Sequence, residues 1–216
     1  QLLTERTGGS DLGALETTAR KVGPDNDGAW LLNGFKWFAS NCAGEAFVVL
    51  AKPEGAPDSS RGVANFLVLC TRRDGSRNGV RVRRLKDKLG NHANASSEIE
   101  YDGATVWLVG EEGRGVPTII EMVNLTRLDC TLGSATSMRT GLTQAVRHAQ
   151  HRKAFGAYLI DQPLMRNVLA DMAVEAEAAT MLAMRMAGAT DRAVRGDERE
   201  SLFRRIGLAA AKYWVC

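Results

Sequence analysis

The sequence predicts an α+β protein in which an antiparallel β-barrel domain is followed by part of an antiparallel helical bundle. Up to about residue 113, short apolar runs are interrupted by Gly, Asn, Asp and Pro, as in strands joined by turns. Beyond that point apolar residues recur every three or four positions, which is the period of one helix face. Strands and helices do not alternate along the chain, which argues against a doubly wound parallel sheet. We therefore expect two domains, residues 1–113 and residues 114–216.

The first domain is expected to consist of short strands. Asn33-Gly34 separates two apolar runs and is a strong signal for a hairpin turn between them. The run 47–51 is apolar throughout and should form a strand buried on both faces, whereas the run 80–83 alternates and should have one wet face. Further strands are expected in residues 30–32, 35–38, 64–70, 98–101 and 106–109. Their roughly even spacing favours an antiparallel barrel or sandwich.

The second domain is expected to hold three helices. A continuous apolar face predicts a first helix over about residues 117–150, with Pro117 in its first turn. After a short loop, a second helix should begin near Pro163 with Asp161 as its N-cap. A third should begin near Glu198, after the break at Gly196-Asp197. Long helices joined by short loops indicate an antiparallel bundle. The wide apolar faces of these three helices require a further partner, either more chain or another subunit.

Composition excludes several classes of protein. No apolar run approaches the roughly 20 residues of a membrane span, and the start is not a signal peptide. The four cysteines and three histidines show no metal-ligand spacing, so no metal site is expected, and scattered cysteines predict reduced thiols in a cytoplasmic protein. The sequence lacks an initiating Met and both ends interrupt a pattern, so we expect an internal piece of a longer protein.

A local cluster of basic residues leaves two interpretations open. It comprises Arg72, Arg73, Arg81, Arg83, Arg84, Lys86 and Lys88. Such a cluster could contact nucleic acid, but a solvated strand face with its loop is the more common explanation and the one we favour. The formal net charge of +3 is weak support for the first interpretation.

A glycine-rich turn near the start carries groups that suit a phosphate. Gly8 and Gly9 let backbone N–H groups turn toward an anion, and the Ser10 hydroxyl could add a donor. The Thr4 hydroxyl could contact a polar ring edge. Nearly 30 residues later, Trp37 lies close to two small residues, Ala39 and Ser40, and could form an aromatic wall. A phosphate cradle with an aromatic wall is what a flavin dinucleotide needs, although a simple turn and a core tryptophan would explain each half separately.

Five segments in this order resemble the acyl-CoA dehydrogenase family of flavoproteins. They are residues 3–11, 36–40, 125–127, 152–156 and 169–172. Residues 84–91, 94–96, 126–130 and 161–166 are more similar to the alkylation-response (AidB-type) branch than to the β-oxidation enzymes. The resemblance implies the middle β-barrel domain and the start of the C-terminal four-helix bundle. It also implies FAD as cofactor, an acyl-CoA thioester as substrate, and a homotetramer or dimer of dimers.

The resemblance further implies which residues contact the cofactor and the substrate. The flavin ring and its phosphates would be held by the first turn and the tryptophan strand, at Leu3, Thr4, Gly9, Ser10, Trp37, Phe38, Ala39 and Ser40. Three residues would reach the flavin's pyrophosphate and adenosine from a neighbouring subunit, namely Arg152, Phe155 and Gln162. The acyl-CoA site would include Ser10, Thr126 and Arg127.

The catalytic base implied by the family is missing from the matching position. In the family a Glu removes the α-proton of the substrate, and a β-hydride passes to flavin N5. Some members carry this Glu immediately before the Arg of the first helix, where this sequence has Thr126, and a hydroxyl cannot serve. Asp129 faces roughly 200° away from Arg127 on a helix, so we do not expect it to act. We therefore assign no catalytic residue and expect no turnover by this piece alone.

Three functions remain open at this level. The first is an FAD-dependent acyl-CoA dehydrogenase-like oxidoreductase. The second is an AidB-type flavoprotein that acts mainly in DNA association or alkylation protection, with weak dehydrogenation. In that case nucleic acid would bind through a C-terminal region that lies outside this sequence. The third is a scaffold that has kept the fold without the flavin.

Overall fold

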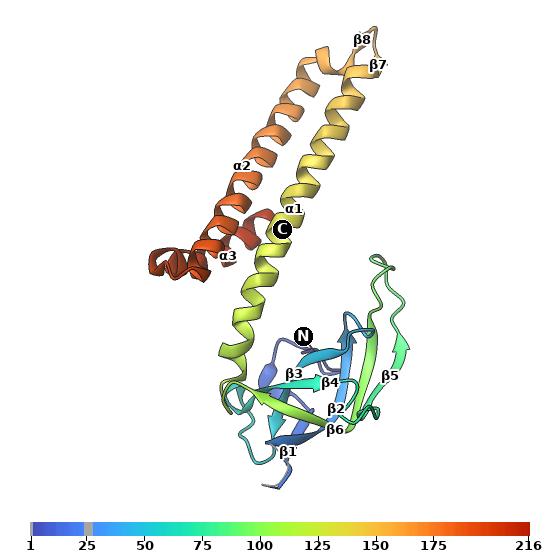
Figure 1. Ribbon diagram of the computed structural model, residues 1–216. Coiled ribbons are helices and arrows are strands. Elements are labelled where there is room, and N and C mark those ends of the chain that lie inside the picture. The colour runs from blue at the N-terminus through green and yellow to red at the C-terminus, as the bar shows by residue number, and fades with distance from the viewer. Residues whose placement is uncertain (1, 24–27) are drawn as a thin grey trace. The chain divides into compact units, whose positions relative to one another are not determined.

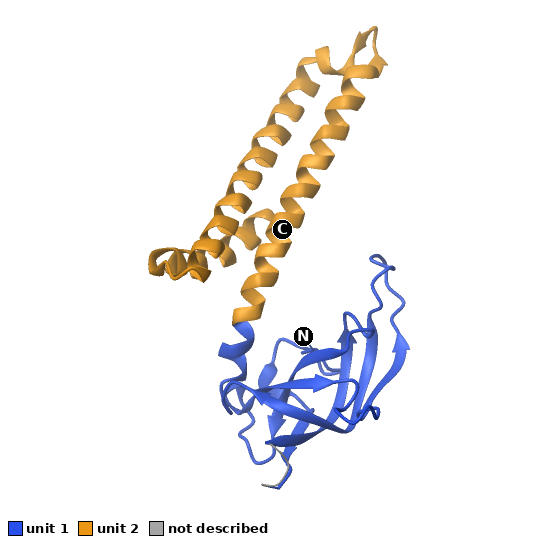
Figure 2. Cartoon of the chain, viewed as in Figure 1, with its two compact units in different colours: residues 1–120 blue, residues 121–216 orange. Residues whose placement is uncertain are grey.

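The computed structural model describes residues 2–23 and 28–216. The chain divides into two compact units, one ending at Ile120 and the other comprising Glu121–Cys216 (Figure 2). The division falls inside a long helix, seven residues beyond the boundary expected from the change of pattern at residue 113.

The first unit is a closed β-barrel. Its strands are β1 (Thr18–Lys21), β2 (Ala29–Ala39), β3 (Ala46–Pro53), β4 (Ala64–Leu69) and β6 (Ser97–Val109), while β5 (Val80–Leu85) lies outside the ring (Figure 1). The order is β2-β1-β3-β4-β6, and pairing of β6 with β2 closes the ring. The predicted α+β fold is confirmed. One barrel pair departs from the antiparallel pattern, because β1 runs parallel to β3.

The barrel interior is filled by large apolar side chains. Trp30 and Phe66 meet edge to face with ring centroids 5.2 Å apart. In the run 47–51, only Val48 retains appreciable exposure, so the prediction of a strand buried on both faces is confirmed. The core also includes Leu2, Leu32, Val49, Val68, Ile99, Tyr101 and Val106.

The predicted hairpin at Asn33-Gly34 is wrong, because both residues lie inside the continuous strand β2. The pairing of β2 with β6 shifts register between Leu32 and Gly34, which marks a β-bulge. Gly34 has a φ of 149°, and a Cβ there would lie 2.7 Å from the Cα of Thr17. The Asn33 side chain accepts a hydrogen bond from the Gly103 N–H at 2.8 Å. Glycine therefore serves a close approach to Thr17, and asparagine bonds across to the partner strand.

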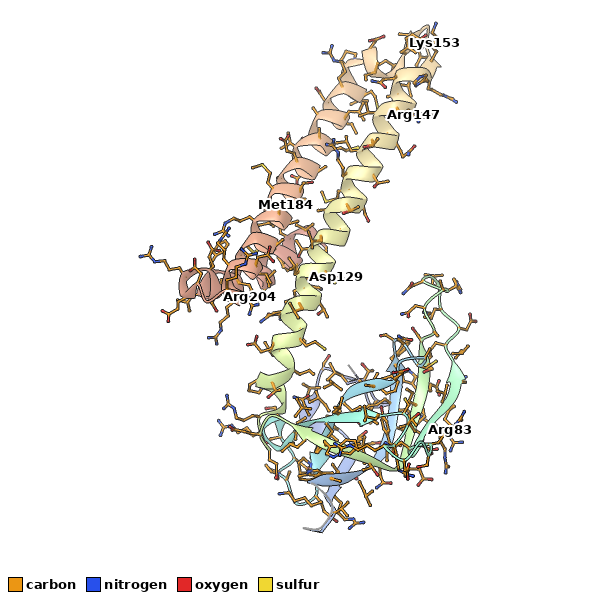
Figure 3. The ribbon with its side chains drawn as sticks, in the orientation of Figure 1. Arg83, Asp129, Arg147, Lys153, Met184 and Arg204 are labelled. Carbon is orange, nitrogen blue, oxygen red and sulfur yellow. The ribbon has the colours of Figure 1, made fainter. Side chains whose placement is uncertain are left out.

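The expected burial of one face of residues 80–83 is also wrong. All residues of β5 after Val80 are exposed, because β5 pairs only with β6 and lies outside the barrel ring. Its arginines form ion pairs with acidic partners, Arg81 with Asp102, Arg83 with Glu100 and Arg84 with Glu98. Figure 3 shows Arg83 on this strand. This part of the basic cluster is thus a solvated strand face whose charges are paired.

The second unit contains most of α1 (Gly115–His151), then α2 (Pro163–Val194) and α3 (Glu198–Val215). A small hairpin of β7 (Lys153–Ala154) and β8 (Ala157–Tyr158) joins α1 to α2, which run antiparallel (Figure 1). The predicted α1 and α3 are confirmed, and Asp197 caps α3 by accepting the Glu200 N–H. None of the described helices combines the length and apolarity needed to cross a membrane.

The predicted N-cap of α2 is wrong by one residue. Gln162 occupies the cap position with extended backbone, while Asp161 ends a preceding 3₁₀ turn, η3 (Leu159–Asp161). Proline disfavours helical geometry in the residue before it, so Pro163 at the first helical position leaves Gln162 as the extended cap.

The helices share two buried apolar clusters, the first of which is built around alanines. Ala135 of α1 shares one buried cluster with Ala179 and Ala183 of α2. Met186 of α2 shares another with Leu208 and Ala211 of α3. On the surface, the guanidinium of Arg185 donates two hydrogen bonds to Glu200, at 2.8 and 3.0 Å.

Candidate functional site

The structure brings the glycine-rich turn against the tryptophan strand. The Trp37 N–H donates to the Thr4 carbonyl oxygen at 2.8 Å. Glu5 and Gly8 exchange backbone hydrogen bonds of 3.0 and 3.1 Å, which closes the turn between them. A Cβ on Gly9 would lie 2.9 Å from the Thr4 Oγ1, so glycine allows this close packing. Thr4, Gly9 and Trp37 therefore form one site within the barrel unit.

A buried ion pair fastens this turn to β2. The Lys36 Nζ lies 2.6 Å from the Glu5 Oε1, and the two side chains are 0% and 2% exposed. Lys36 also donates to the Leu3 carbonyl at 3.4 Å. Glu5 further accepts the N–H groups of Glu16 and Thr17, at 2.6 and 3.2 Å, and the Thr17 hydroxyl. The segment that carries Leu3 and Thr4 is thus anchored to β2 by a buried polar cluster in which Glu5 accepts hydrogen bonds from several donors.

The Glu5 and Lys36 charges each shift the pKa of the other group. Burial raises the pKa of the Glu5 carboxyl, but the Lys36 charge and the hydrogen bonds more than offset this and hold the pKa below its ordinary value. Burial lowers the pKa of Lys36, and the Glu5 charge offsets that effect only in part.

Charged side chains surround the Trp37 indole. The Lys86 Nζ lies 3.2 Å from the ring centroid, and the guanidinium carbons of Arg6 and Arg84 each lie 5.7 Å from it. Glu98 accepts from Lys86 at 2.9 Å and from Arg84 at 2.6 Å. Burial raises the pKa of Glu98, but these two hydrogen bonds and charges bring it below its ordinary value. Arg6, Trp37, Arg84 and Glu98 line a hollow of about 570 Å³.

Ser10 lines a different hollow from Trp37. That hollow measures about 740 Å³ and includes Asp11, Lys52 and Ser59. Asp11 accepts the Gly13 N–H at 3.1 Å, which orders the start of the short 3₁₀ turn η1 (Leu12–Ala14). The turn that carries Thr4 therefore continues into a second concave surface.

The remaining candidates on β2 differ in what they can offer. Phe38 is 43% exposed, and its ring lies 4.5 Å from the Lys86 Nζ. The side chain of Ala39 is fully buried in the barrel core. Ser40, just after the strand, is exposed.

The candidate site residues of the second unit form two groups. The first group lies at the β7–β8 hairpin. Phe155 has a φ of 54° and is 99% exposed, with Gly156 following at a φ of 82°. A bulky residue rarely adopts this conformation, and such outliers gather at functional sites. Gln162 donates to the Ala154 carbonyl at 3.0 Å, and Arg152 is exposed. Figure 3 labels Lys153 on the same hairpin.

The second group lies on α1. The Thr126 hydroxyl donates to the Val123 carbonyl at 2.8 Å, as is common on helices. Arg127, an expected substrate contact, donates to the Asn124 side chain at 3.0 Å. Because Asn124 is neutral, the arginine keeps its net positive charge. Asp129 is exposed on the same helix (Figure 3).

The sequence analysis missed several residues of the barrel site. The position of Lys36 could have been recognised from the sequence, because alternation along β2 places it on the same inward face as Trp30 and Leu32. A buried cation on that face needs a partner. Lys86 and Glu98 carried no such signal. Glu98 lies on β6 and Lys86 directly follows β5, and both approach Trp37 only because β2 and β5 pair on either side of β6.

The chain matches two protein-family models. The family model of the acyl-CoA dehydrogenase middle domain matches residues 1–104, and that of the acyl-CoA dehydrogenase C-terminal domain matches residues 113–216. The chain belongs to the acyl-CoA dehydrogenase family. Among curated members of this family, the putative acyl-CoA dehydrogenase AidB of Escherichia coli K12 is 44% identical over 214 residues, covering 99% of the chain and 38% of that protein.

Solved structures of the family superpose over almost the whole chain. Caenorhabditis elegans ACDH-11 in complex with C11-CoA has a TM-score of 0.89 at 30% identity, covering 100% of the chain and 37% of that structure. Acyl-CoA dehydrogenase complexed with FAD from Bacillus anthracis has a TM-score of 0.75 at 25% identity, with coverages of 99% and 35%. The chain thus spans less than two fifths of the length of these family members.

Proposed function

We propose that this chain is part of an FAD-dependent acyl-CoA dehydrogenase-type oxidoreductase that introduces an α,β double bond into an acyl-CoA thioester. The observation that carries the proposal is the direct contact between the Thr4 and Trp37 backbones, which joins the glycine-rich turn to the aromatic strand. Two structural relatives support the ligands, one complexed with FAD and one with C11-CoA.

The residues present fit a flavin nucleotide. Trp37 offers a flat apolar surface beside a hollow of about 570 Å³, and the Thr4 hydroxyl lies next to Gly9. Arg152 offers a planar fork that suits a pyrophosphate, supplied in our proposal from a neighbouring subunit of a tetramer. FAD, when bound, supplies the acceptor for the substrate hydride. This chain's part is to orient the ring through Thr4 and Trp37 and to neutralise phosphate charge.

The proposed substrate contacts are Ser10, Thr126 and Arg127. Ser10 lines a separate hollow in which Lys52 already pairs with Asp58 at 2.5 Å, so in our proposal the Ser10 hydroxyl is the donor to the phosphates of the thioester ligand. Arg127 keeps a net charge that an anionic group can neutralise. No residue of this chain is proposed as the base that removes the α-proton. We also propose that the protein is located in the cytoplasm.

The basic cluster on β5 does not favour nucleic acid, the alternative function. A protein that binds DNA through such a surface presents unneutralised cations to phosphates. Here Arg81, Arg83 and Arg84 each already pair with an acidic residue of β6. Salt-dependent retention of DNA by the longer protein would revive that alternative.

The test is the absorbance spectrum of the purified protein that carries this chain. We expect flavin bands, and bleaching of those bands by acyl-CoA under anaerobic conditions. Thr4→Val and Arg152→Ala should each lower FAD occupancy, whereas Thr18→Val and Arg199→Ala, at exposed positions, should not. Unchanged occupancy in both site variants would remove the site assignment, and failure of the wild type to take up added FAD would remove the function.

A further inference from the structure

Lys86 covers one face of the Trp37 indole. Its ammonium lies 3.2 Å from the ring centroid, a distance at which it must stand directly above the ring. The Lys86 side chain is 7% exposed, so water screens this cation–π contact weakly. The same ammonium lies 4.5 Å from the Phe38 ring, and thus it bridges two neighbouring aromatic residues of β2.

Glu98 and the backbone hold Lys86 in this position. The Glu98 Oε1 accepts from Lys86 at 2.9 Å, and Glu98 is itself only 5% exposed. Arg84 donates to the same oxygen at 2.6 Å. The Lys86 N–H donates to the Ser96 carbonyl at 2.8 Å, which ties the end of β5 to β6. The ammonium is therefore fixed from the β6 side before it meets the indole.

We propose that Lys86 is a positioning residue that holds the Trp37 indole in a single orientation and so sets the aromatic wall of the flavin site. The inference rests on the proposed function for its link to FAD. Trp37 is half-buried at the rim of its hollow, where the packing around it is incomplete. A side chain in that situation has several open rotamers, and a cation fixed above its face selects one of them.

The barrel contains a matched control for this arrangement. Lys21 lies 4.9 Å from the Trp30 ring centroid and pairs with Glu112 at 2.5 Å, which repeats the same three residue types. However, Lys21 is 65% exposed, and Trp30 is packed in the barrel core. Core packing fixes the Trp30 ring, so loss of Lys21 should leave it in place.

The experiment compares Lys86→Met, Lys86→Arg and Lys21→Met in the protein that carries this chain. The first measurement uses FAD-free protein and follows acrylamide quenching of tryptophan fluorescence, with Trp37→Phe identifying the Trp37 component. We expect Lys86→Met to raise quenching of that component about twofold, and Lys86→Arg to restore it, since a guanidinium also stacks on an indole. Lys21→Met should leave it unchanged.

The second measurement is the affinity for FAD. Lys86→Met should weaken it about tenfold through the loosened indole, Lys86→Arg should restore it, and Lys21→Met should match the wild type. If Lys86→Met fails to fold, Glu98→Gln tests the same claim, because it releases the ammonium from its anchor and should shift quenching in the same direction.

The outcomes separate this inference from the proposed function. Unchanged quenching in Lys86→Met would overturn the positioning role whatever FAD does. Suppose that Lys86→Met raises quenching but Lys86→Arg does not return it to the wild-type level. That result would also overturn the positioning role, because the shape of the lysine side chain, and not its charge, would then explain the effect. Quenching that rises in Lys86→Met and is restored in Lys86→Arg, in a protein that never binds FAD, would support the positioning of Trp37 by Lys86. It would overturn only the proposed flavin function.

Discussion

The buried Glu5–Lys36 pair allows a quantitative test of how the candidate site is held together. Lys36→Met would leave the Glu5 carboxylate buried with the donors of Glu16 and Thr17. Breaking a buried ion pair by removing one partner costs about 3–5 kcal/mol. The carboxyl can also bind a proton, at a cost of about 4 kcal/mol at pH 7. Because its remaining donors are good, we expect a loss of about 3 kcal/mol of unfolding free energy.

The reverse substitution should cost more. Glu5→Gln leaves the Lys36 ammonium with the Leu3 carbonyl at 3.4 Å and the amide oxygen of the new side chain. Neutralising a lysine at pH 7 costs about 5 kcal/mol, which sets the limit on the penalty. We expect a loss of about 4 kcal/mol, and a double variant that loses less than the sum of the two.

The assay is urea unfolding at pH 7 followed by tryptophan fluorescence. Trp30, Trp37 and Trp107 lie in the barrel and only Trp214 lies in α3, so the signal reports mainly on the barrel. A loss below about 1 kcal/mol for Lys36→Met, the range of an exposed pair, would refute the argument. A larger loss for Lys36→Met than for Glu5→Gln would refute the stated asymmetry.

Two further predictions concern pH and backbone conformation. Because the pKa values of Glu5 and Glu98 lie below those of the unfolded chain, the stability they add is complete above the unfolded glutamate pKa and is lost as pH falls through the folded values. The unfolding free energy should decline below about pH 4.5, and the decline should be less steep in Glu98→Gln. Urea unfolding at a series of pH values checks this, and equal slopes of free energy against pH in the wild type and the variant would contradict it. Gly34→Ala should destabilise the barrel by more than about 1 kcal/mol, since its Cβ would meet Thr17 and its φ is positive. Gly133→Ala in α1, where a Cβ meets nothing within 4 Å, should be neutral or stabilising, and equal thermal shifts in the two variants would count against the argument.

Much of the helical unit followed from the sequence. The three-to-four-residue period of apolar positions placed α1 within two residues of its observed start. Asp197 before Glu198 marked the start of α3, and the structure shows its side chain accepting the Glu200 N–H. These features depend on neighbours within one helical turn, so local sequence is sufficient to predict them.

The barrel depended more on distant contacts. Asn33-Gly34 has the composition of a hairpin turn, but Thr17 and Gly103 hold it inside a long strand. The alternation in residues 80–83 correctly indicates a strand but not its burial, because β5 pairs outside the barrel ring. Neither outcome could be predicted locally, since each depends on which strands become neighbours.

The candidate site shows the same division. The sequence by itself supplied the flexible glycines, the hydroxyls and the indole, because residue type sets what chemistry a position can perform. Only the tertiary structure decided that the Thr4 carbonyl meets the Trp37 N–H, that Glu5 neutralises Lys36 inside the barrel, and that the Lys86 ammonium, just after β5, covers the indole. These contacts join residues separated by about thirty to fifty positions, and barrel closure is the physical event that brings them together.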